Sequence, residues 1–594
     1  MGVLLFGIGV LLVRAVYLEV YQQDWLQKQS DKRHNRVVSI PAYRGMIMDR
    51  NGEALAISSP VKTLSCNPQK LLHKREELRQ AFEESRRVFE AQGRAASKII
   101  QDKYQLAKID FLQFEDSLSS MEELLGMEAG ELLGKLEKAR KKHFMYLGRQ
   151  KSPELAQQIL DMDLPSVRAV QKYRRFYPMA ESAAHVIGFN NIDGKGVEGI
   201  EKAQDSVLAG KDGKKRVIRD GRGHLIENIE LLDDMQPGQD VTLSLDRRLQ
   251  YLAYKALKAR VFELDAETGS VVVLDTQTGE ILAMANMPGF NPNDRSSRKA
   301  YKYRNRAVVD TYEAGSTMKP LTIAAGIETR VIDANVEIDT SPGFIKLSKR
   351  YTVRDHVNFG KISLSYLLAK SSNVGASRIA LLMEPREHWM FLSRMGFGRV
   401  PDAGFPAEAA GTLTNYAKWG RVDSASHGYG YGIAVSLLQM VRAYTPFAAD
   451  GKLRSVSISK VQKPTLSQQV MSKETANSVL HMMEAVVTPK ATGKLAMING
   501  YRVAGKTGTA RKFVNKKYRT DRFVTSFIGI APVSKPRLVV GVMINDPKSD
   551  KSGGKAAAPV FAKVMSEALR ILDIAPDNLP PEQKVVSVKT GGAT

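Results

Sequence analysis

The sequence contains a single cysteine, Cys66, among its 594 residues. One cysteine permits neither an internal disulfide nor a cysteine-based metal site. The sequence also lacks zinc-ligand spacing and the mixed aromatic and basic signature of RNA-binding domains, so we expect no metal and no nucleic-acid partner. Its net charge of +24 comes from basic residues scattered along the chain, which favours contact with anionic lipid or polymer surfaces instead.

The sequence has no uninterrupted apolar run of about 20 residues, the length that spans a membrane as a helix. The nearest is residues 2–13, which Arg14 interrupts before residues 15–18 resume it. We interpret residues 1–21 as an uncleaved single-pass anchor whose Arg14 snorkels to an interface, because neither a basic start nor a small-residue cleavage site indicates a signal peptide. Basic residues only follow the run, at Lys28, Lys32, Arg33 and Arg36. A short basic segment upstream of Met1 would explain this reversed flank.

The length and a hydrophobic fraction of 43% predict two or more folded domains. In the first, residues 22–240, Asn51 and Gly52 lie between short apolar runs and predict a hairpin. Residues 71–142 are rich in Lys, Arg and Glu, which predicts amphipathic helices that are either solvated or form a partner-binding arm. Gly-rich turns are expected at residues 193–196 and 220–223.

The second domain, residues 241–575, is predicted to contain one antiparallel sheet. A helix-like segment, 247–264, is followed by two strand candidates with a hairpin turn at residues 275–279. Three more strand candidates close the domain, at residues 501–510, 523–530 and 538–544. Helix-rich sequence separates the early strands from the late ones. This order predicts an α+β domain whose five-stranded antiparallel sheet is covered by helices on both faces. Residues 576–594 are expected to form a flexible tail.

Ser316 and Lys319 are the first candidates for chemistry. They precede the apolar spacing of a buried helix, and residues three apart share one face of a helical turn. A lysine whose pKa is lowered by burial or nearby positive charge can take the proton of a serine nucleophile. The spacing alone is weak evidence, because it recurs elsewhere and most such pairs lie on solvated surfaces. It recurs at Ser59/Lys62, Ser296/Lys299, Ser457/Lys460 and Ser552/Lys555.

Two later motifs strengthen the evidence that Ser316 and Lys319 belong to a catalytic site. Ser371 and Asn373 end an apolar helical stretch, 362–370, and Lys506, Thr507, Gly508 and Thr509 lie on a strand candidate. Each alone more often marks a loop cap or a strand-end turn, and residues 65–67 and 589–591 mimic them. In this order, Ser-x-x-Lys, Ser-x-Asn and Lys-Thr-Gly form the pattern of penicillin-binding proteins and serine β-lactamases.

The pattern assigns each residue a hypothetical role. Ser316 is the nucleophile and Lys319 its base. Ser371 moves a proton toward the leaving amine, and Asn373 holds a peptide amide of the substrate. Lys506 adds positive potential that keeps Lys319 unprotonated, Thr507 and Thr509 offer hydroxyls to a substrate carboxylate, and Gly508 leaves the strand bare for an extended peptide. The backbone N–H groups of Ser316 and Thr509 form an oxyanion hole.

The chain resembles the class B, monofunctional penicillin-binding proteins, and within them the FtsI type that acts at the division septum. Matching segments are distributed over nearly the whole chain: residues 44–52, 194–201, 313–320, 371–375, 428–432, 505–510 and 544–547. Segment 71–142 is longer than expected for this family.

The resemblance implies a peptidoglycan D,D-transpeptidase that needs no cofactor. Its substrates would be stem pentapeptides ending in D-Ala-D-Ala, β-lactams would acylate it, and D,D-carboxypeptidase activity would be a weak side reaction. It would be anchored in the inner membrane with its catalytic domain in the periplasm, beside an FtsW-type glycan polymerase and other divisome proteins. A β-lactamase-like hydrolase and a non-catalytic β-lactam receptor or divisome scaffold remain the alternatives.

Overall fold

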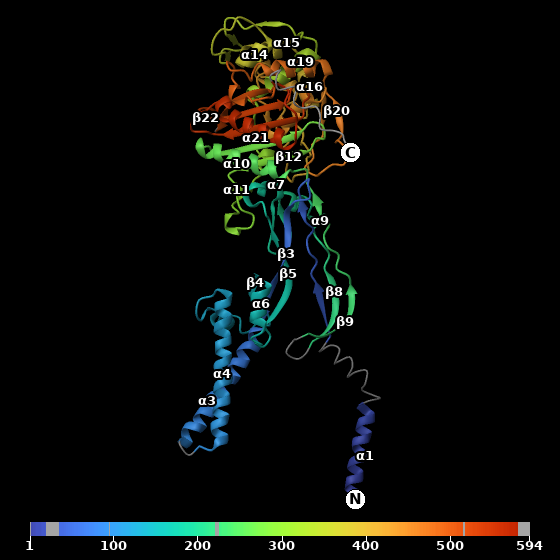
Figure 1. Cartoon of the computed structure of the whole chain (residues 1–594), viewed down its shortest axis with the longest axis vertical. Helices are drawn as coiled ribbons and strands as arrows, with labels where there is room; N and C mark the ends of the chain where they lie inside the picture. The colour runs from blue at the N-terminus through green and yellow to red at the C-terminus, as the bar shows by residue number, and fades with distance from the viewer. Residues whose placement is uncertain (1, 19–34, 94–95, 220–224, 515–516, 580–594) are drawn as a thin grey trace, which may run out of the picture. The chain divides into compact units, whose positions relative to one another are not determined.

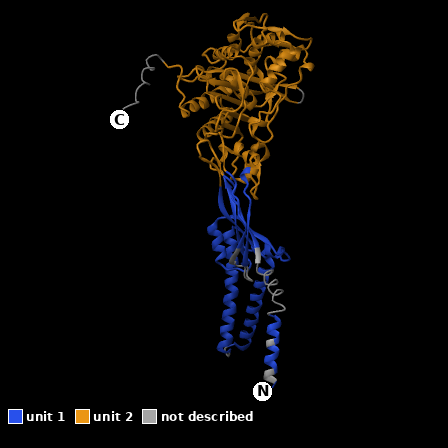
Figure 2. Cartoon of the chain, turned by 90° about the vertical axis from the view of Figure 1, so that its right-hand side faces the viewer, with its two compact units in different colours: residues 1–45, 58–176, 207–239 blue, residues 46–57, 177–206, 240–594 orange. Residues whose placement is uncertain are grey.

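The computed structural model describes residues 2–18, 35–93, 96–219, 225–514 and 517–579 (Figure 1). The chain forms two compact units (Figure 2). Unit 1 comprises residues 1–45, 58–176 and 207–239, and unit 2 comprises residues 46–57, 177–206 and 240–594. Each unit is therefore assembled from three separate segments of the chain.

The first helix of unit 1 is α1 (Gly2–Val16), with 15 residues. Among the described residues, no helix combines the length and apolar character needed to cross a membrane. Residues 19–21 of the predicted anchor lie outside the described residues, as do Lys28, Lys32 and Arg33 after it.

Unit 1 also contains two groups of strands. One is an antiparallel sheet in the order β1-β8-β9, formed by β1 (Asn35–Ile40), β8 (Gly213–Arg219) and β9 (Leu225–Asp233). In the other, β3 (Ala54–Cys66) pairs with β4 (Met145–Lys151) and with β5 (Arg168–Phe176). The predicted turn at residues 220–223 lies outside the described residues.

The segment predicted to be helical forms α3 (Pro68–Gln92), α4 (Lys98–Leu125) and α5 (Glu131–Lys138), which confirms the prediction. The side chain of Asn67 starts α3 by accepting hydrogen bonds from the backbone N–H groups of Gln69 and Lys70. The start of α3 and the end of α4 pack with strands β3 and β4 and with α6 (Pro153–Leu160) around a small core. That core includes Leu64, Leu71, Phe114, Leu118, Met121, Leu125 and Leu147.

Unit 2 is organised around a five-stranded sheet in the order β12-β11-β23-β22-β21. All neighbouring strands in it are antiparallel. The strands are β11 (Thr268–Asp275), β12 (Ile281–Met287), β21 (Ala504–Val514), β22 (Lys517–Ala531) and β23 (Leu538–Asn545). The predicted hairpin turn between β11 and β12 is confirmed. Strand β21 forms one edge of the sheet, so its outer side is open to a ligand.

Helices cover both faces of this sheet (Figure 1). Side chains alternate between faces along a strand, and Val540 and Val542 of β23 join the core under α10 (Arg247–Glu263) and α21 (Ala558–Ile571). Gly541, between them, faces α18 (Leu437–Tyr444) on the other side, where an added Cβ would lie 2.3 Å from Val441. Strands β11, β12 and β23 are thus buried on both faces.

The remaining elements of unit 2 are short. Around residues 177–206 they are α7 (Ala184–Ile187), β6 (Phe189–Asn190), β7 (Gly196–Glu198), α8 (Gly199–Ala203) and α9 (Asp205–Leu208), which continues into unit 1. The helix-rich block contains α11 (Ala300–Tyr303), α12 (Arg306–Val309), β13 (Tyr312–Glu313), α13 (Lys319–Glu328), β14 (Glu337–Asp339), β15 (Phe344–Lys346), β16 (Thr352–Arg354), β17 (Lys361–Ser363), α14 (Leu364–Lys370), α15 (Asn373–Leu382), α16 (Pro385–Arg394), α17 (Arg421–His427), β18 (Ala434–Val435), β19 (Lys452–Arg454), β20 (Ser467–Gln469) and α19 (Lys473–Glu484). Helix α20 (Gly553–Ala556) follows β23.

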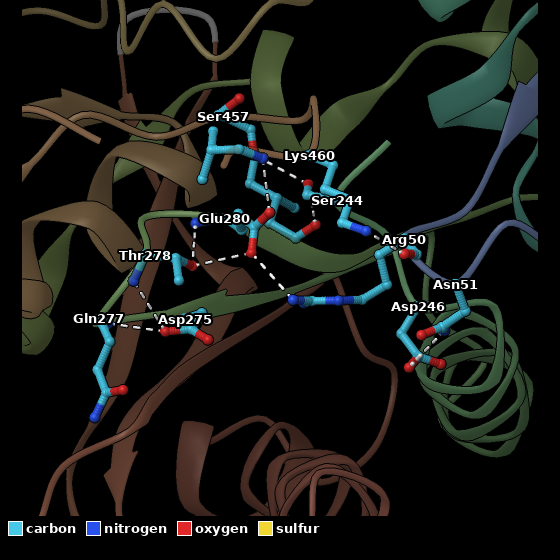
Figure 3. A network of polar contacts seen from close by, with 12 residues as sticks. Arg50, Asn51, Ser244, Asp246, Asp275, Gln277, Thr278, Glu280, Ser457 and Lys460 are labelled. Carbon is cyan, nitrogen blue, oxygen red and sulfur yellow. Dashed lines mark hydrogen bonds and ion pairs between the residues drawn. The ribbon is translucent and has the colours of Figure 1, made fainter. Parts of the chain in front are cut away.

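Residues 46–57 belong to unit 2, although they are far from the rest of it in sequence. The predicted hairpin is confirmed: β2 (Ile47–Met48) pairs antiparallel with the start of β3, and parallel with β10 (Val241–Thr242). Its turn is held by a polar network (Figure 3). The guanidinium of Arg50 pairs with Glu280 at 3.2 Å, and the Nζ of Lys460 donates to the backbone carbonyl of Arg50 at 2.9 Å. These bonds fix the amino-terminal segment to unit 2.

The far end of the chain is ordered beyond the predicted start of the tail. The carboxylate of Asp577 accepts hydrogen bonds from the backbone N–H groups of Arg502 and Ser534, at 2.7 and 3.0 Å. Residues 580–594 of the predicted tail lie outside the described residues.

Candidate active site

Ser316 lies in a 3-10 turn, Gly315–Met318, directly before α13. The sequence predicted the first turn of the helix, and the α-helical hydrogen bonding starts one turn later, at Lys319. The fold buries Lys319 completely beneath this turn. A lysine with no exposed surface must find its hydrogen-bond partners inside the protein.

Four atoms surround the Nζ of Lys319. They are Ser316 Oγ at 3.0 Å, Ser371 Oγ at 3.0 Å, Asn373 Oδ1 at 2.8 Å and the carbonyl oxygen of Ser371 at 2.6 Å. The last two can only accept hydrogen bonds, so they take the two hydrogens of a neutral amine. The amine lone pair is then left to accept a hydrogen bond from a serine hydroxyl. This arrangement would allow Lys319 Nζ to accept a proton from Ser316 Oγ.

The electrostatic environment also favours the neutral, unprotonated form of Lys319. Burial lowers the pKa of Lys319 well below its usual 10.5, and the positive charge of Lys506 lowers it further. The carboxylate of Asp355 acts in the opposite direction and raises this pKa. Lys506 is itself fully buried, and burial lowers its pKa to about 7. The sequence predicted that burial or a nearby positive charge would lower the pKa of Lys319; in the structure both do, and burial has the larger effect.

The second motif lies at the junction of two helices. Helix α14 ends at Lys370, and its C-cap residue Ser371 has a φ of 59°, in the left-handed region. The predicted helix over residues 362–370 is shorter at its start, because Ile362 belongs to β17. The next residue, Ser372, caps α15 by accepting a hydrogen bond from the backbone N–H of Gly375 at 2.9 Å. This sharp reversal aims both the hydroxyl and the carbonyl of Ser371 at Lys319.

Asp355, which the sequence did not indicate, holds this junction in place. Its carboxylate accepts a hydrogen bond from the hydroxyl of Ser372 and from the backbone N–H groups of Asn373 and Val374, the latter two at 2.6 and 3.1 Å. Asp355 follows β16 and belongs to no sequence motif, so no local signal could have found it. Its three bonds fix the start of α15, and therefore the side chain of Asn373.

The third motif lies on β21, as predicted. The Nζ of Lys506 donates to Ser371 Oγ at 3.0 Å and to the backbone carbonyl of Thr507 at 3.1 Å. The hydroxyl of Thr507 donates to Thr492, at 3.2 Å, while that of Thr509 accepts from the backbone N–H of Gly553 at 3.1 Å. Thr509, unlike Thr507, thus keeps its hydroxyl hydrogen for another acceptor.

Gly508 is required for a reason other than the one the sequence suggested. An added Cβ would point into the protein, 2.2 Å from the hydroxyl oxygen of Ser526 and 3.0 Å from the methyl group of Thr317. Glycine therefore lets β21 pack closely against the 3-10 turn that carries Ser316. The expectation that Gly508 leaves the strand bare for a peptide does not describe this packing.

A glycine-rich loop, residues 428–432, packs against the other side of the nucleophile's turn. The backbone N–H of Gly315 donates to the carbonyl of Gly430 at 3.0 Å, and the N–H of Gly432 donates to Glu313 at 2.8 Å. A Cβ at Gly430, whose φ is +85°, would lie 2.1 Å from the carbonyl oxygen of Gly315. The sequence associated this loop with the family but assigned it no role.

Two of the other copies of these patterns have structural uses. Lys460 and Ser457 hydrogen-bond to backbone carbonyls, of Arg50 and Ser459 respectively. Asn67, in the copy of the second motif, caps α3. The copy at residues 589–591 lies outside the described residues. All eight residues predicted for the site, from Ser316 to Thr509, lie in unit 2.

The buried Lys506 gives the fold a pH dependence of predictable sign. In the unfolded chain its pKa returns to about 10.4, whereas in the folded chain it is about 7. Between these values the unfolded state binds the extra proton, so the free energy of unfolding rises with pH. The wild type should therefore become more stable relative to Lys506→Met as pH increases from 7 toward about 10. Urea unfolding midpoints measure the difference.

The matched control for that experiment is Lys517→Met, which removes an exposed lysine from the neighbouring strand β22. Its midpoint difference from the wild type should be flat over the same pH range. A flat difference for Lys506→Met as well would mean that Lys506 remains protonated in the folded protein.

Two family models match the chain: the penicillin binding protein transpeptidase domain over residues 269–566, and the penicillin-binding protein dimerisation domain over residues 39–243. Among curated relatives, the probable peptidoglycan D,D-transpeptidase PbpC of Pseudomonas aeruginosa is 36% identical, covering 97% of this chain and 95% of the relative. The peptidoglycan D,D-transpeptidase FtsI of Escherichia coli K12 is 35% identical, covering 98% and 93%.

Solved structures agree. Penicillin binding protein 3 of Mycobacterium tuberculosis, complexed with aztreonam, is 25% identical and covers 92% of this chain and 99% of that one, with a TM-score of 0.66. The transpeptidase domain of Burkholderia pseudomallei penicillin-binding protein 3 is 38% identical and covers 57% and 98%, with a TM-score of 0.52. The chain belongs to the penicillin-binding protein family, among the class B proteins of the FtsI and PenA type. It has the two-domain architecture of that family, with an α+β transpeptidase fold.

Proposed function

We propose that this protein is a peptidoglycan D,D-transpeptidase that cross-links stem peptides at the division septum through an acyl-enzyme on Ser316. The observation that carries the proposal is the position of a buried amine, Lys319 Nζ, 3.0 Å from Ser316 Oγ and bonded to two obligate acceptors. Relatives named D,D-transpeptidase over nearly their full length support the same chemistry.

Acylation begins when Lys319 takes the hydroxyl proton of Ser316. The Ser316 oxygen attacks the carbonyl carbon of the penultimate D-alanine, and the negative charge on the carbonyl oxygen is held by the backbone N–H groups of Ser316 and Thr509. The proton returns from Lys319 through the hydroxyl of Ser371 to the nitrogen of the scissile bond. That bond breaks and the terminal D-alanine leaves as an amine, with the stem acyl group esterified to Ser316.

Deacylation reverses these steps with a side-chain amine of a neighbouring stem. The amine attacks the ester carbon and passes a proton to Lys319, and Ser316 recovers it as the cross-link forms. Water in place of the amine gives the weak D,D-carboxypeptidase reaction. The amide nitrogen of Asn373 binds a carbonyl of the donor peptide, and the hydroxyl of Thr509 binds its terminal carboxylate. Lys506, Thr507 and Gly508 position strand β21 beside Ser316 and Ser371. No cofactor takes part.

The setting of the protein is part of the proposal. Residues 1–21 anchor it in the inner membrane, residues 22–240 form a pedestal and residues 241–575 form the periplasmic transpeptidase domain. Its partners are an FtsW-type glycan polymerase and other divisome proteins. The names of its FtsI relatives support the septal role.

The test is the intact mass of the protein after brief exposure to penicillin, followed for an hour. A stable single adduct, absent from Ser316→Ala, is expected because the acyl-enzyme of a transpeptidase is released by an acceptor amine and only slowly by water. A transient adduct with rapid destruction of the drug would identify a β-lactamase instead. A stable adduct without cross-linking of stem peptides would indicate a non-catalytic β-lactam receptor or scaffold. The absence of any adduct would refute the proposal.

A further inference from the structure

A pocket at the start of α10 takes no part in the proposed chemistry. Its volume is about 880 Å³, within the range of about 300–1,000 Å³ that is typical of small-molecule sites. Its walls come from three segments of unit 2: residues 49–53, residues 178–182 and the first two turns of α10. We call it the α10 pocket. None of the eight residues predicted for the active site lines it.

Hydrogen bonds fix the three walls to one another. The buried carboxylate of Asp49 accepts from the backbone N–H of Arg247 at 3.0 Å, which attaches the early hairpin to the start of α10. The side-chain nitrogen of Gln250 donates to the backbone carbonyl of Ser182 at 2.6 Å, which attaches the third wall to the same helix. The pocket is therefore preformed, so a ligand does not have to order its walls.

Tyr251 gives the pocket an aromatic surface. It lies on the same side of α10 as Tyr254, since residues three apart share one face of a helix. Tyr254 is buried, and its hydroxyl donates to the carboxylate of Glu181 at 2.6 Å, whereas Tyr251 is 51% exposed. The electron-rich face of a half-exposed ring attracts C–H groups that carry partial positive charge, such as those on one face of a sugar ring.

The charged side chains around the pocket are paired with one another. Three ion pairs surround it: Arg247–Glu53 at 3.1 Å, Arg248–Asp246 at 2.7 Å and Lys258–Glu181 at 2.8 Å. A densely charged ligand would have to break these pairs in order to bind. Paired carboxylates and guanidiniums still have further lone pairs and N–H groups, which can bond to hydroxyl and amide groups. The pocket therefore favours a neutral ligand that is rich in hydroxyl and amide groups.

We propose that the α10 pocket binds a neutral glycan of N-acetylated sugar rings. Each such ring has a C–H face for Tyr251, and hydroxyl and amide groups for the ion pairs beside it. The glycan strand that carries the stem peptides has this chemistry. The choice of that strand rests on the proposed function, whereas the preference for sugar does not. A strand bound here would keep its stem peptides close to the protein at high effective concentration.

The test is saturation-transfer NMR of the full chain in a non-ionic detergent, with chitotriose as the probe. The wild type should transfer saturation to the acetyl and ring protons of chitotriose, and a titration gives the dissociation constant. Tyr251→Ala should raise this constant about tenfold, whereas Tyr251→Phe, which keeps the ring, should change it little. The matched control is Phe262→Ala, an exposed change on the same helix outside the pocket, which should leave it unchanged. Far-UV circular dichroism checks that each variant keeps its helices.

Two further measurements distinguish the α10 pocket from other sites. Protein acylated by penicillin at Ser316 should bind chitotriose as tightly as free protein, because active-site residues do not line the pocket. Salt at about 0.5 M should not weaken binding, because a neutral ligand has no charge to screen. The absence of saturation transfer, an unchanged affinity in Tyr251→Ala, or loss of binding on acylation or in salt would each overturn the proposal. Failure of penicillin to acylate Ser316 would instead refute the proposed function and leave the chitotriose titration valid.

Discussion

Lys319→Arg should lower the rate of acylation by penicillin about a thousandfold, within the range that loss of a general base produces. Arginine keeps the positive charge and much of the length of lysine, but its guanidinium cannot lose a proton in a protein. The neutral amine that accepts the Ser316 proton is therefore absent. The change separates the role of Lys319 as a base from a role as a fixed charge.

The measurement is the time course of adduct formation by intact mass, at several penicillin concentrations. Lys361→Arg, an exposed change on β17, is the matched control and should acylate at the wild-type rate. Because arginine is larger than the buried space of Lys319, Lys319→Met serves as a second variant that fits it. Acylation of both variants within tenfold of the wild type would show that another group takes the proton.

Asp355→Asn should slow acylation about a hundredfold through loss of geometry at the second motif. The carboxylate accepts three hydrogen bonds, and an amide of the same shape turns an NH₂ group toward at least one of those donors. Leaving a buried donor unpaired costs about 1–3 kcal/mol, and the start of α15 should shift. Asn373 and Ser371 would then no longer hold Lys319 in place.

A pH profile distinguishes this role from general destabilisation. The Asp355 carboxylate raises the pKa of Lys319, so its removal should lower that pKa. Lys319 would then stay neutral to more acidic pH, and the acid limb of the acylation profile should move to lower pH. Loss of rate with an unmoved acid limb would mean that Asp355 acts only on packing. The control is Asp339→Asn, an exposed carboxylate on β14.

Most of the site could be predicted from the sequence, because its residues are carried by three short motifs. Ser316, Lys319, Ser371, Asn373 and Lys506 converge as expected. The hairpin at Asn51 and the charged helices were also local signals. They depend on a turn dipeptide and on periodicity, which neighbouring residues determine.

What the sequence could not provide depends on contacts between distant segments. Asp355 has an ordinary context, and its importance comes from facing the start of α15. The need for glycine at 508 arises from Ser526 on the next strand and from Thr317, and that at 430 from the backbone of Gly315. The division of work between Thr507 and Thr509 likewise follows from Thr492 and Gly553. No local pattern records such neighbours.

The turn fixed by Arg50 and Lys460 has a consequence for how the chain is made. Asp49 accepts a hydrogen bond from the backbone N–H of Arg247, which is translated 198 residues later. At roughly 5–20 residues per second, the early hairpin waits about 10–40 s for that partner, and longer for Lys460. During this interval Ile47, Leu55 and Ala56, fully buried or nearly so in the finished fold, lack the later segments of unit 2 that complete their burial. The nascent chain therefore exposes apolar side chains, a condition that favours aggregation, well before its catalytic residues are translated.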